Sequence, residues 1–169
     1  MRHGRWAPVV TENTASCWSD CAFRSVDLSA GTPQKLSDGR DFVLSPTKAQ
    51  IALRESPGDA RLNRLRLVAL DAGADLLSFT TDGSIADVQF LPDGRGIVFL
   101  DMPASGPRHL RFISPAHPDS VELAQWTDSI LSAPVGPFGS YPIDPTGCFT
   151  IADTDLAPGP GTRLVLLPE

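Results

Sequence analysis

The chain lacks any apolar run that approaches the roughly 20 residues a membrane-spanning helix needs. Its N-terminal stretch, MRHGRWAPVVTENTASC, is basic but has no apolar core of about 7–15 residues, so it does not fit a signal peptide. We therefore expect no membrane insertion. The compartment is left open, because the sequence as written indicates the cytoplasm, whereas a trimmed fragment would also fit a periplasmic or exported protein.

Positive charge is also scarce. Lys and Arg number 14 against 20 Asp and Glu, which gives a net charge of −6, and the cations do not cluster. Nucleic-acid binding depends on such clusters, because they displace the counterions of the phosphate backbone. The tryptophans, Trp6, Trp18 and Trp126, do not alternate with basic residues as base-stacking platforms do. A nucleic-acid partner is therefore not expected.

Cysteine is rare and odd in number: Cys17, Cys21 and Cys148. The spacing of CWSDC differs from that of a zinc knuckle, and the second pair of ligands is missing. A Cys17–Cys21 disulfide across a tight hairpin would require an oxidising compartment. Free thiols are the favoured interpretation.

Helical periodicity is nearly absent from the 169 residues. The best candidate, Ile51 to Leu77, contains Pro57, Gly58 and Gly73, and its apolar residues do not keep a helical period. With 16 prolines and 14 glycines the chain is instead rich in turn signals, while 41% hydrophobic and 20% charged residues are typical of a folded domain. Short apolar runs between turns predict an all-β fold, as a sandwich, barrel or propeller.

An internal repeat favours the propeller. Three turns that contain a proline and are followed by an apolar strand and an acidic residue can be aligned: FVLSPTKAQIALRE (Phe42–Glu55), VQFLPDGRGIVFLD (Val88–Asp101) and SYPIDPTGCFTIAD (Ser140–Asp153). With one deletion in the third copy, Phe149 corresponds to Ile51 and Ile97. A further strand follows each turn: LRLVALD (Leu65–Asp71), LRFISP (Leu110–Pro115) and TRLVLLP (Thr162–Pro168). The repeat of about 42 to 54 residues is near the roughly 40–50 residues of a four-stranded propeller blade.

We therefore predict one domain over residues 1–169, with blades at about residues 6–40, 41–86, 87–132 and 138–169. The expected fold is a β-propeller of about three to four blades of four antiparallel strands, as an incomplete or a small ring. Exposed end faces are costly in repeat architectures, because each unit buries its apolar faces against its neighbours. Three outcomes stay open: part of a longer six- or seven-bladed protein, a closed four-bladed ring, or association with a second copy.

The stretch LPDGRGIVFLD, followed by LRFIS, resembles the TolB-like, WD-related β-propeller repeat. FRSVDLSAG and LRLVALDAGA are similar to the later strand and turn of that repeat. The middle copy has the full Pro-Asp-Gly-Arg, where the others have SPTKAQ and DPTGC. The resemblance implies a propeller that makes protein–protein contacts through one face. In the turn itself, we expect Asp93 and Gly94 to supply the turn geometry and Arg95 to face solvent.

A charge pattern recurs with the repeat. The second strand of each copy ends in an acid and the next strand has an arginine at its second position: Glu12, Glu55, Asp101 and Asp153 with Arg24, Arg66, Arg111 and Arg163. In an antiparallel hairpin these positions lie close together at the loop end. One interpretation is a ring of charges that binds a ligand or partner at one rim. The favoured interpretation is four cross-strand ion pairs that fix register, each worth about 0.2–1 kcal/mol.

Catalytic and metal-binding patterns are missing as well. The sequence contains no Gly-x-Ser-x-Gly nucleophile elbow, and the three histidines, His3, His109 and His117, have no evident partner. The segment from Asp153 to Asp155 starts like a calcium loop, but the following LAPGPG lacks the later oxygen ligands. The sequence therefore predicts no catalytic residues, no cofactor and no metal site.

These observations predict a non-catalytic propeller module that binds a protein partner, with self-association through the open blade edges as a further prediction. The loops SPGDARLN, MPASGPR and TDLAPGPG join second and third strands and are the expected binding regions. Two alternatives stay open: the gating propeller of a prolyl-oligopeptidase-like serine peptidase whose catalytic domain is absent, or a small-molecule- or carbohydrate-binding propeller. For the latter, the candidate aromatic residues are Trp18, Phe138 and Tyr141.

Overall fold

The structure, a computed structural model, describes residues 6–11, 22–27, 33–37, 41–56, 63–126, 149–153 and 162–168. The regular elements of these segments are β-strands: β1 (Trp6–Thr11), β2 (Ala22–Asp27), β3 (Pro33–Ser37), β4 (Asp41–Leu44), β5 (Gln50–Glu55), β6 (Arg64–Ala69), β7 (Asp75–Thr80), β8 (Ser84–Phe90), β9 (Ile97–Met102), β10 (Arg108–Ser114), β11 (His117–Trp126), β12 (Phe149–Asp153) and β13 (Thr162–Leu166). The prediction of an all-β chain is therefore confirmed. Within the same segments, no helix is long and apolar enough to cross a membrane.

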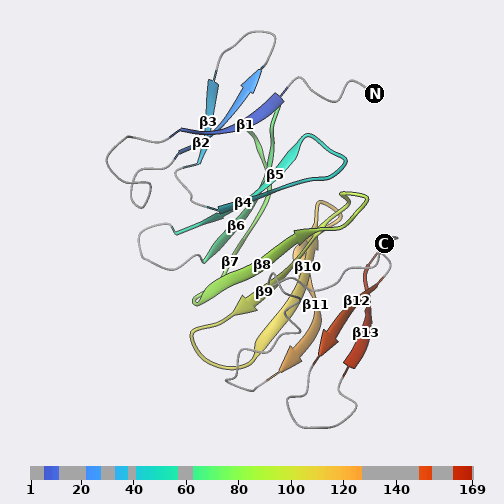
Figure 1. Cartoon of the computed structure of the whole chain (residues 1–169). Helices are drawn as coiled ribbons and strands as arrows, with labels where there is room; N and C mark the ends of the chain where they lie inside the picture. The colour runs from blue at the N-terminus through green and yellow to red at the C-terminus, as the bar shows by residue number, and fades with distance from the viewer. Residues whose placement is uncertain are drawn as a thin grey trace.

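The described strands form four antiparallel sheets, which we number in chain order. Sheet 1 contains β1–β2–β3, sheet 2 contains β4–β5–β6–β7, sheet 3 contains β8–β9–β10–β11, and sheet 4 contains β12–β13. Each strand pairs with its neighbour in the sequence, so each sheet is a simple meander. Figure 1 shows the sheets in this order along the molecule, with sheet 1 at one end and sheet 4 at the other.

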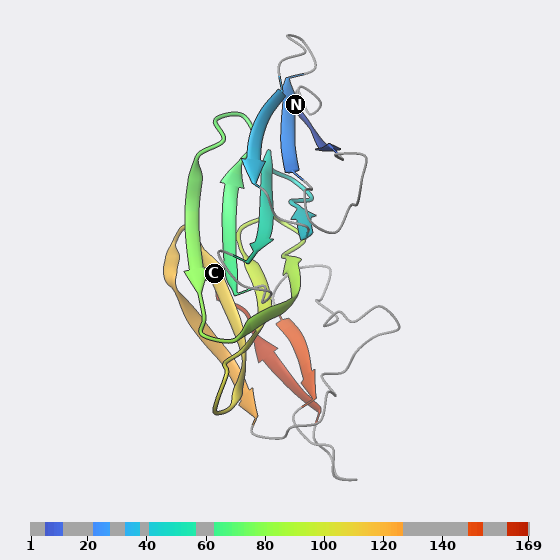
Figure 2. The ribbon, with the colours of Figure 1, turned by 90° about the vertical axis from the view of Figure 1, so that its left-hand side faces the viewer.

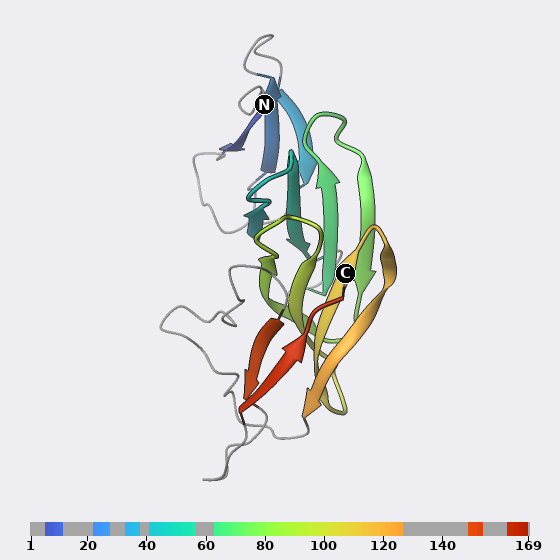
Figure 3. The ribbon, with the colours of Figure 1, turned by 90° about the vertical axis from the view of Figure 1, so that its right-hand side faces the viewer.

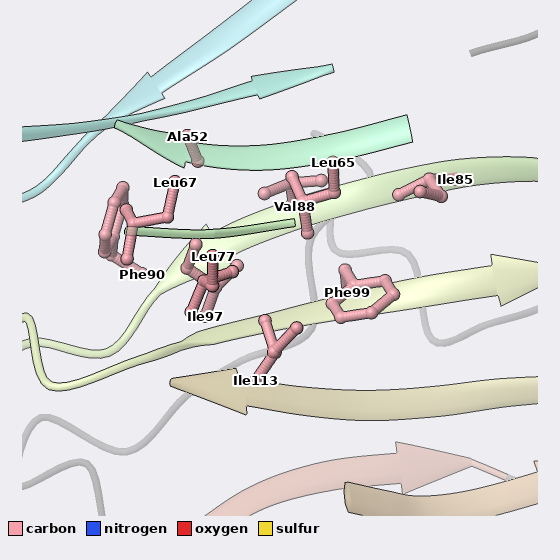
Figure 4. Close-up of a cluster of buried hydrophobic side chains, with 10 residues drawn as sticks. All are labelled: Ala52, Leu65, Leu67, Leu77, Ile85, Val88, Phe90, Ile97, Phe99 and Ile113. Atoms are coloured by element: carbon pink, nitrogen blue, oxygen red, sulfur yellow. The ribbon is translucent and has the colours of Figure 1, made fainter. Parts of the chain in front are cut away.

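The sheets pack face to face, and the interface between each consecutive pair is apolar. Between sheets 1 and 2, Leu36 packs with side chains of sheet 2: Ile51, Leu53, Val68 and Leu70. Between sheets 2 and 3 lies the cluster drawn in Figure 4: Ala52, Leu65, Leu67, Leu77, Ile85, Val88, Phe90, Ile97, Phe99 and Ile113. Between sheets 3 and 4, Leu167 packs with side chains of sheet 3: Leu91, Val98, Leu100, Leu110 and Phe112. Burial of apolar surface between sheets is therefore the main force that stacks them.

Strand β9 shows why this sequence folds in this way. Ile97 and Phe99 belong to the apolar layer shared with sheet 2, whereas Val98 and Leu100 belong to the layer shared with sheet 4. Successive side chains of a strand point to opposite faces, so a strand covered on both faces needs a continuous apolar run. The run GIVFL meets this requirement, and its last four residues are buried.

The four sheets form an open stack rather than a closed ring, as the two side views in Figures 2 and 3 show. Antiparallel four-stranded sheets packed in series are consistent with the predicted propeller, and the number of blades in a ring stays a prediction. Sheets 2 and 3 are four-stranded units that span residues 41–80 and 84–126. Sheet 3 thus begins at Ser84, three residues before the predicted blade limit at residue 87.

The register of sheet 4 differs by one residue from the alignment that the sequence suggested. In sheet 3, Ile97 pairs with Ile113, which lies two residues after the recurring arginine of β10. The residue two positions after the arginine of β13 is Val165, and it pairs with Thr150. By this comparison, Thr150 and not Phe149 corresponds to Ile97, so the predicted correspondence of Phe149 with Ile97 is wrong. A shift of one residue places Phe149 on the opposite face of its sheet.

Candidate functional site

The first predicted charge pair joins β5 and β6 in sheet 2. Arg66 lies opposite Leu53, two residues along β5 from Glu55, so Glu55 and Arg66 are diagonal neighbours on one face. Nη1 of Arg66 donates to Oε1 of Glu55 at 2.7 Å, and its Nε donates to Oδ1 of Asp75 on β7 at 3.0 Å. Hydrogen bonding to Asp75 raises the pKa of Arg66, burial opposes this rise, and Glu55 adds to it.

The second predicted pair joins β9 and β10 in sheet 3. Arg111 lies opposite Phe99, diagonal to Asp101, and its Nε donates to Oδ2 of Asp101 at 2.8 Å. Asp101 is 3% exposed, so its charge is removed from water and Arg111 compensates this desolvation. The predicted pairing is thus confirmed in sheets 2 and 3.

Both arginines also reach the sheet that precedes their own. Nη1 of Arg66 donates to the carbonyl oxygen of Leu36 on β3 at 3.3 Å. The guanidinium carbon of Arg111 lies 5.6 Å from the ring centre of Phe79 on β7, within the range of a cation–π contact. The four paired side chains are 22% exposed or less. These contacts favour the interpretation that the pairs are structural and fix hairpin register and sheet packing. They argue against a ring of charges that is open to a ligand.

The register of sheet 4 differs from that of sheets 2 and 3. Arg163 pairs with Ala152, so Asp153 lies beside the position opposite Arg163 rather than diagonal to it. The side chains of Asp153 and Arg163 lie outside what the structure describes, so their pairing stays a prediction. Glu12, the acid of the fourth predicted pair, lies outside the described residues.

The turn between β8 and β9 contains the Pro-Asp-Gly-Arg sequence. The amide of Leu91 donates to the carbonyl of Gly96 at 3.0 Å, and Gly94 has a φ of +69°, which residues with a side chain rarely adopt. The hydroxyl of Thr47, in the corresponding turn of sheet 2, donates to the carbonyl of Asp93 at 2.7 Å. A Cβ atom on Gly94 would lie 2.4 Å from that hydroxyl oxygen. This turn therefore reverses the chain and packs against the turn of the preceding sheet.

We predicted that Arg95 faces solvent, but its side chain binds another part of the chain. Its Nε donates to the carbonyl of Pro168 at 3.1 Å, which ties the turn of sheet 3 to the segment that follows β13. Asp93 accepts hydrogen bonds from the amide of Arg95, at 2.9 Å, and from its guanidinium. Burial opposes the ionisation of Asp93, but these hydrogen bonds and the charges of Arg95 and Lys48 outweigh burial and lower the pKa of Asp93.

A charge cluster that the sequence analysis did not anticipate joins sheets 2 and 3. Arg54 on β5 forms an ion pair with Asp41 on β4, and its Nη1 donates to the carbonyl of Ile85 on β8 at 2.9 Å. Asp87 lies in a β-bulge of β8 with a φ of +49°. Burial lowers the pKa of Arg54 and raises the pKa of Asp87, and the charge of each residue opposes the shift of the other. Asp41, Arg54 and Asp87 thus place two acids and one base at the junction of the two sheets.

The remaining predicted positions are the two partly buried histidines of sheet 3 and residues that lie outside the described part of the chain. Nδ1 of His109 lies 2.8 Å from Oε2 of Glu122, a partner on β11 that the sequence analysis missed. The ring of His117 lies 6.1 Å from that of Phe112. The positions outside the described residues are His3, Cys17, Trp18, Cys21, Phe138, Tyr141, Cys148 and Asp155. Among the residues that the structure describes, no group of three or more side chains could hold a metal ion.

The loop between β9 and β10 is the predicted binding loop that the structure describes in full. The amide of Ala104 donates to Oδ1 of Asp82 at 3.1 Å, and a Cβ atom on Gly83 would lie 1.8 Å from the carbonyl oxygen of Met102. The base of the loop is therefore held tightly against the connection between sheets 2 and 3. Its tip is exposed, and a Cβ atom on Gly106 would meet nothing within 4 Å.

The end of β13 brings together one exposed and one buried leucine. Leu167 is 7% exposed and packs on sheet 3, whereas its neighbour Leu166 is 79% exposed. The register pairs Leu166 with Phe149 and Leu164 with Ile151, and directly paired residues share a face of an antiparallel sheet.

No protein-family profile matches the chain, and no curated protein does. Several solved structures do match. An uncharacterized protein of Listeria monocytogenes EGD-e, lmo1340, has a TM-score of 0.57 at 13% identity over 96% of this chain and 50% of its own. TolB from Acinetobacter baumannii has a TM-score of 0.52 at 21% identity over 98% of this chain and 42% of its own. Oligogalacturonate lyase in complex with manganese has a TM-score of 0.53 at 18% identity over 81% of this chain and 36% of its own.

The sheets have the fold of part of a β-propeller, similar to that of TolB. Identities of 13% to 21% establish the fold alone, because propellers host many unrelated activities. The chain spans 36% to 50% of the length of these three proteins. The stack of sheets described above is therefore shorter than the propeller proteins that it matches.

Proposed function

We propose that this chain is a non-catalytic β-propeller module that acts by protein–protein contact, and that the surface around Leu166, at the end of β13, is a contact surface. The observation that carries the proposal is Leu166, which is 79% exposed beside a buried neighbour on the same strand. Exposure of this large apolar side chain to water is unfavourable, and burial of Leu166 against a partner would remove that cost.

The charged residues support the non-catalytic part of this proposal. Arg54, Arg66 and Arg111 each bind an acid within their own sheet and contact a neighbouring sheet. Their hydrogen bonds and ring contact hold the scaffold together. The scaffold in turn gives the sheet faces and the loop at residues 103–107 fixed positions, as a binding module requires.

Site-specific photo-crosslinking tests this proposal. A photoreactive phenylalanine analogue in place of Leu166 is expected to capture a protein in the cells that naturally produce the chain. The captured protein, once purified, should bind the wild type and lose most of its affinity for the Leu166→Asp variant. The matched control places the same analogue at Leu76, which is 40% exposed on β7. Equal capture at both positions, or equal affinity for the wild type and Leu166→Asp, would contradict the proposal.

A further inference from the structure

We propose that a single water molecule binds inside the chain, between sheets 2 and 3, and donates one hydrogen bond to Asn63 and one to Asp101. This water site joins consecutive sheets at the base of the loop at residues 103–107, and it is independent of the contact surface at Leu166. Two buried acceptor oxygens, their place on facing sheets and the charge around them carry the proposal.

Two side-chain oxygens are buried without a hydrogen-bond donor from the described residues: Oδ1 of Asn63 and Oδ1 of Asp101. Asp101 is 3% exposed, and Nε of Arg111 donates to its other oxygen, Oδ2, at 2.8 Å. Burial removes an acceptor from water, which is costly unless a donor replaces the lost hydrogen bonds. Each of the two oxygens therefore requires a donor.

Asn63 lies on the face of sheet 2 that is turned toward sheet 3. The amide of Thr81 donates to the carbonyl of Asn63 at 3.0 Å, which extends the β6–β7 ladder one residue beyond the pair of Arg64 with Thr80. Leu65 belongs to the apolar cluster between sheets 2 and 3, and alternate residues of a strand share a face. Asn63, two residues before Leu65, therefore belongs to the same face, at the end of the ladder.

Asp101 lies on the opposing face of sheet 3. Phe99 belongs to the same apolar cluster, and Asp101 follows it by two residues on β9. Phe79, which pairs with Leu65 on sheet 2, has its ring centre 5.0 Å from that of Phe99. Figure 4 shows Leu65 and Phe99 toward the same end of the cluster. The row of Leu65 on sheet 2 therefore faces the row of Phe99 on sheet 3.

Contacts of the connection between the two sheets place Asn63 and Asp101 at one end of this interface. The hydroxyl of Thr81, the partner of Asn63 in the ladder, accepts from the amide of Gly83 at 3.4 Å. A Cβ atom on Gly83 would lie 1.8 Å from the carbonyl oxygen of Met102, the residue after Asp101. Asn63 and Asp101 thus belong to the same end of the interface, one on each sheet, where one small molecule can serve both oxygens.

The surroundings favour a neutral ligand that donates hydrogen bonds. Both oxygens only accept, and Arg111 already compensates the charge of Asp101. A cation would add an uncompensated charge to a buried site and would need more oxygen ligands than these two. A water molecule has two hydrogens to donate, and buried water typically makes about three hydrogen bonds to polar groups without another partner. Water therefore meets the requirement of both oxygens at once.

A crystal structure of the 169-residue chain tests the proposal. We expect an electron-density peak at about 2.5–3.0 Å from Oδ1 of Asn63 and from Oδ1 of Asp101. The peak should be absent from Asn63→Leu, which replaces the acceptor by an apolar side chain. The matched control is Asn63→Ser, whose hydroxyl still accepts and should keep the peak. A wild type without the peak would overturn the proposal, whether or not the amide nitrogen of Asn63 then donates directly to Asp101.

Thermal unfolding in sodium, potassium and choline chloride at equal ionic strength tests whether the ligand is a cation. A bound water molecule predicts that the wild type and Asn63→Ser respond alike to the choice of salt. A melting temperature of the wild type that rises in sodium or potassium chloride, and does not rise in Asn63→Ser, would show that a cation occupies the site and would overturn the proposal. This comparison does not depend on the folding of Asn63→Leu.

Discussion

Arg111 joins two sheets through two different contacts. Its Nε donates to the buried carboxylate of Asp101 within sheet 3, and its guanidinium lies 5.6 Å from the ring centre of Phe79 on sheet 2. Phe79 in turn packs on Phe99 of sheet 3, with ring centres 5.0 Å apart. One arginine thus neutralises a buried acid and covers an aromatic pair at the junction of two sheets.

A double-mutant cycle measures the strength of this link. Arg111→Ala is expected to lower the free energy of unfolding by about 3–5 kcal/mol, because Asp101 is then left buried without its partner. The cycle with Asp101→Ala should give a coupling energy of about 1–3 kcal/mol in urea unfolding experiments. The control cycle combines Asp93→Ala with Arg95→Ala, since the side chain of Asp93 is 46% exposed, and should give about 1 kcal/mol or less. Equal coupling energies in the two cycles would show that burial does not strengthen the Asp101 pair.

The sequence predicted those features that depend on neighbouring strands. Asp101 and Arg111 lie 10 residues apart in one hairpin, so their meeting follows from the alternation of a β-ladder. The contact of Arg54 with Ile85 joins residues 31 positions apart on different sheets, and it depends on how the sheets stack. An arginine within the apolar run IALRE was the available signal for it, because a buried cation needs a partner.

Sheet 4 shows the other limit of prediction from sequence. Its turn, DPTGC, lacks the Pro-Asp-Gly-Arg of sheet 3, and the alignment across it required a deletion. A slip of one residue exchanges the two faces of a strand, and this explains why the predicted match of Phe149 with Ile97 failed.

Gly94→Ala is expected to destabilise the protein more than Gly106→Ala does. Gly94→Ala is destabilising for two reasons: alanine rarely adopts a φ of +69°, and its Cβ atom would lie 2.4 Å from the hydroxyl oxygen of Thr47. The matched control is Gly106→Ala, which has a φ of +95° but meets nothing within 4 Å. We expect Gly106→Ala to lower the free energy of unfolding by about 1–2 kcal/mol and Gly94→Ala to lower it by at least about 1 kcal/mol more. Equal losses in thermal or urea unfolding would show that the contact with Thr47 does not constrain the turn.

Asp87 is expected to reduce stability at neutral pH. Its pKa in the folded state is raised above the ordinary value of 3.8, so its contribution to stability is complete below pH 3.8 and is lost as the pH rises through the folded-state pKa. Asn tolerates the φ of +49° and carries no charge. Asp87→Asn should therefore be more stable than the wild type at pH 7, and the difference should vanish below pH 3.8 in urea unfolding measured across this range. A variant less stable than the wild type at pH 7 would show that Arg54 outweighs the burial of Asp87.

Asp93→Asn should change the free energy of unfolding at pH 7 in the direction opposite to Asp87→Asn. Both substitutions replace Asp by Asn within the same sheet. Its folded-state pKa is lowered below 3.8, so its charge stabilises the fold above that pH, and this contribution is lost as the pH falls through the folded-state pKa. Asp93→Asn keeps one oxygen for the amide of Arg95 and removes the charge together with the second oxygen, which accepts from the guanidinium. We expect a loss of about 1 kcal/mol or less at pH 7, because the side chain is 46% exposed, and no loss at a pH below the folded-state pKa. If the two substitutions change the free energy of unfolding at pH 7 in opposite directions, burial destabilises the charge of Asp87 and hydrogen bonding stabilises that of Asp93. If both changes have the same direction, an effect of the Asp-to-Asn substitution itself dominates at both sites.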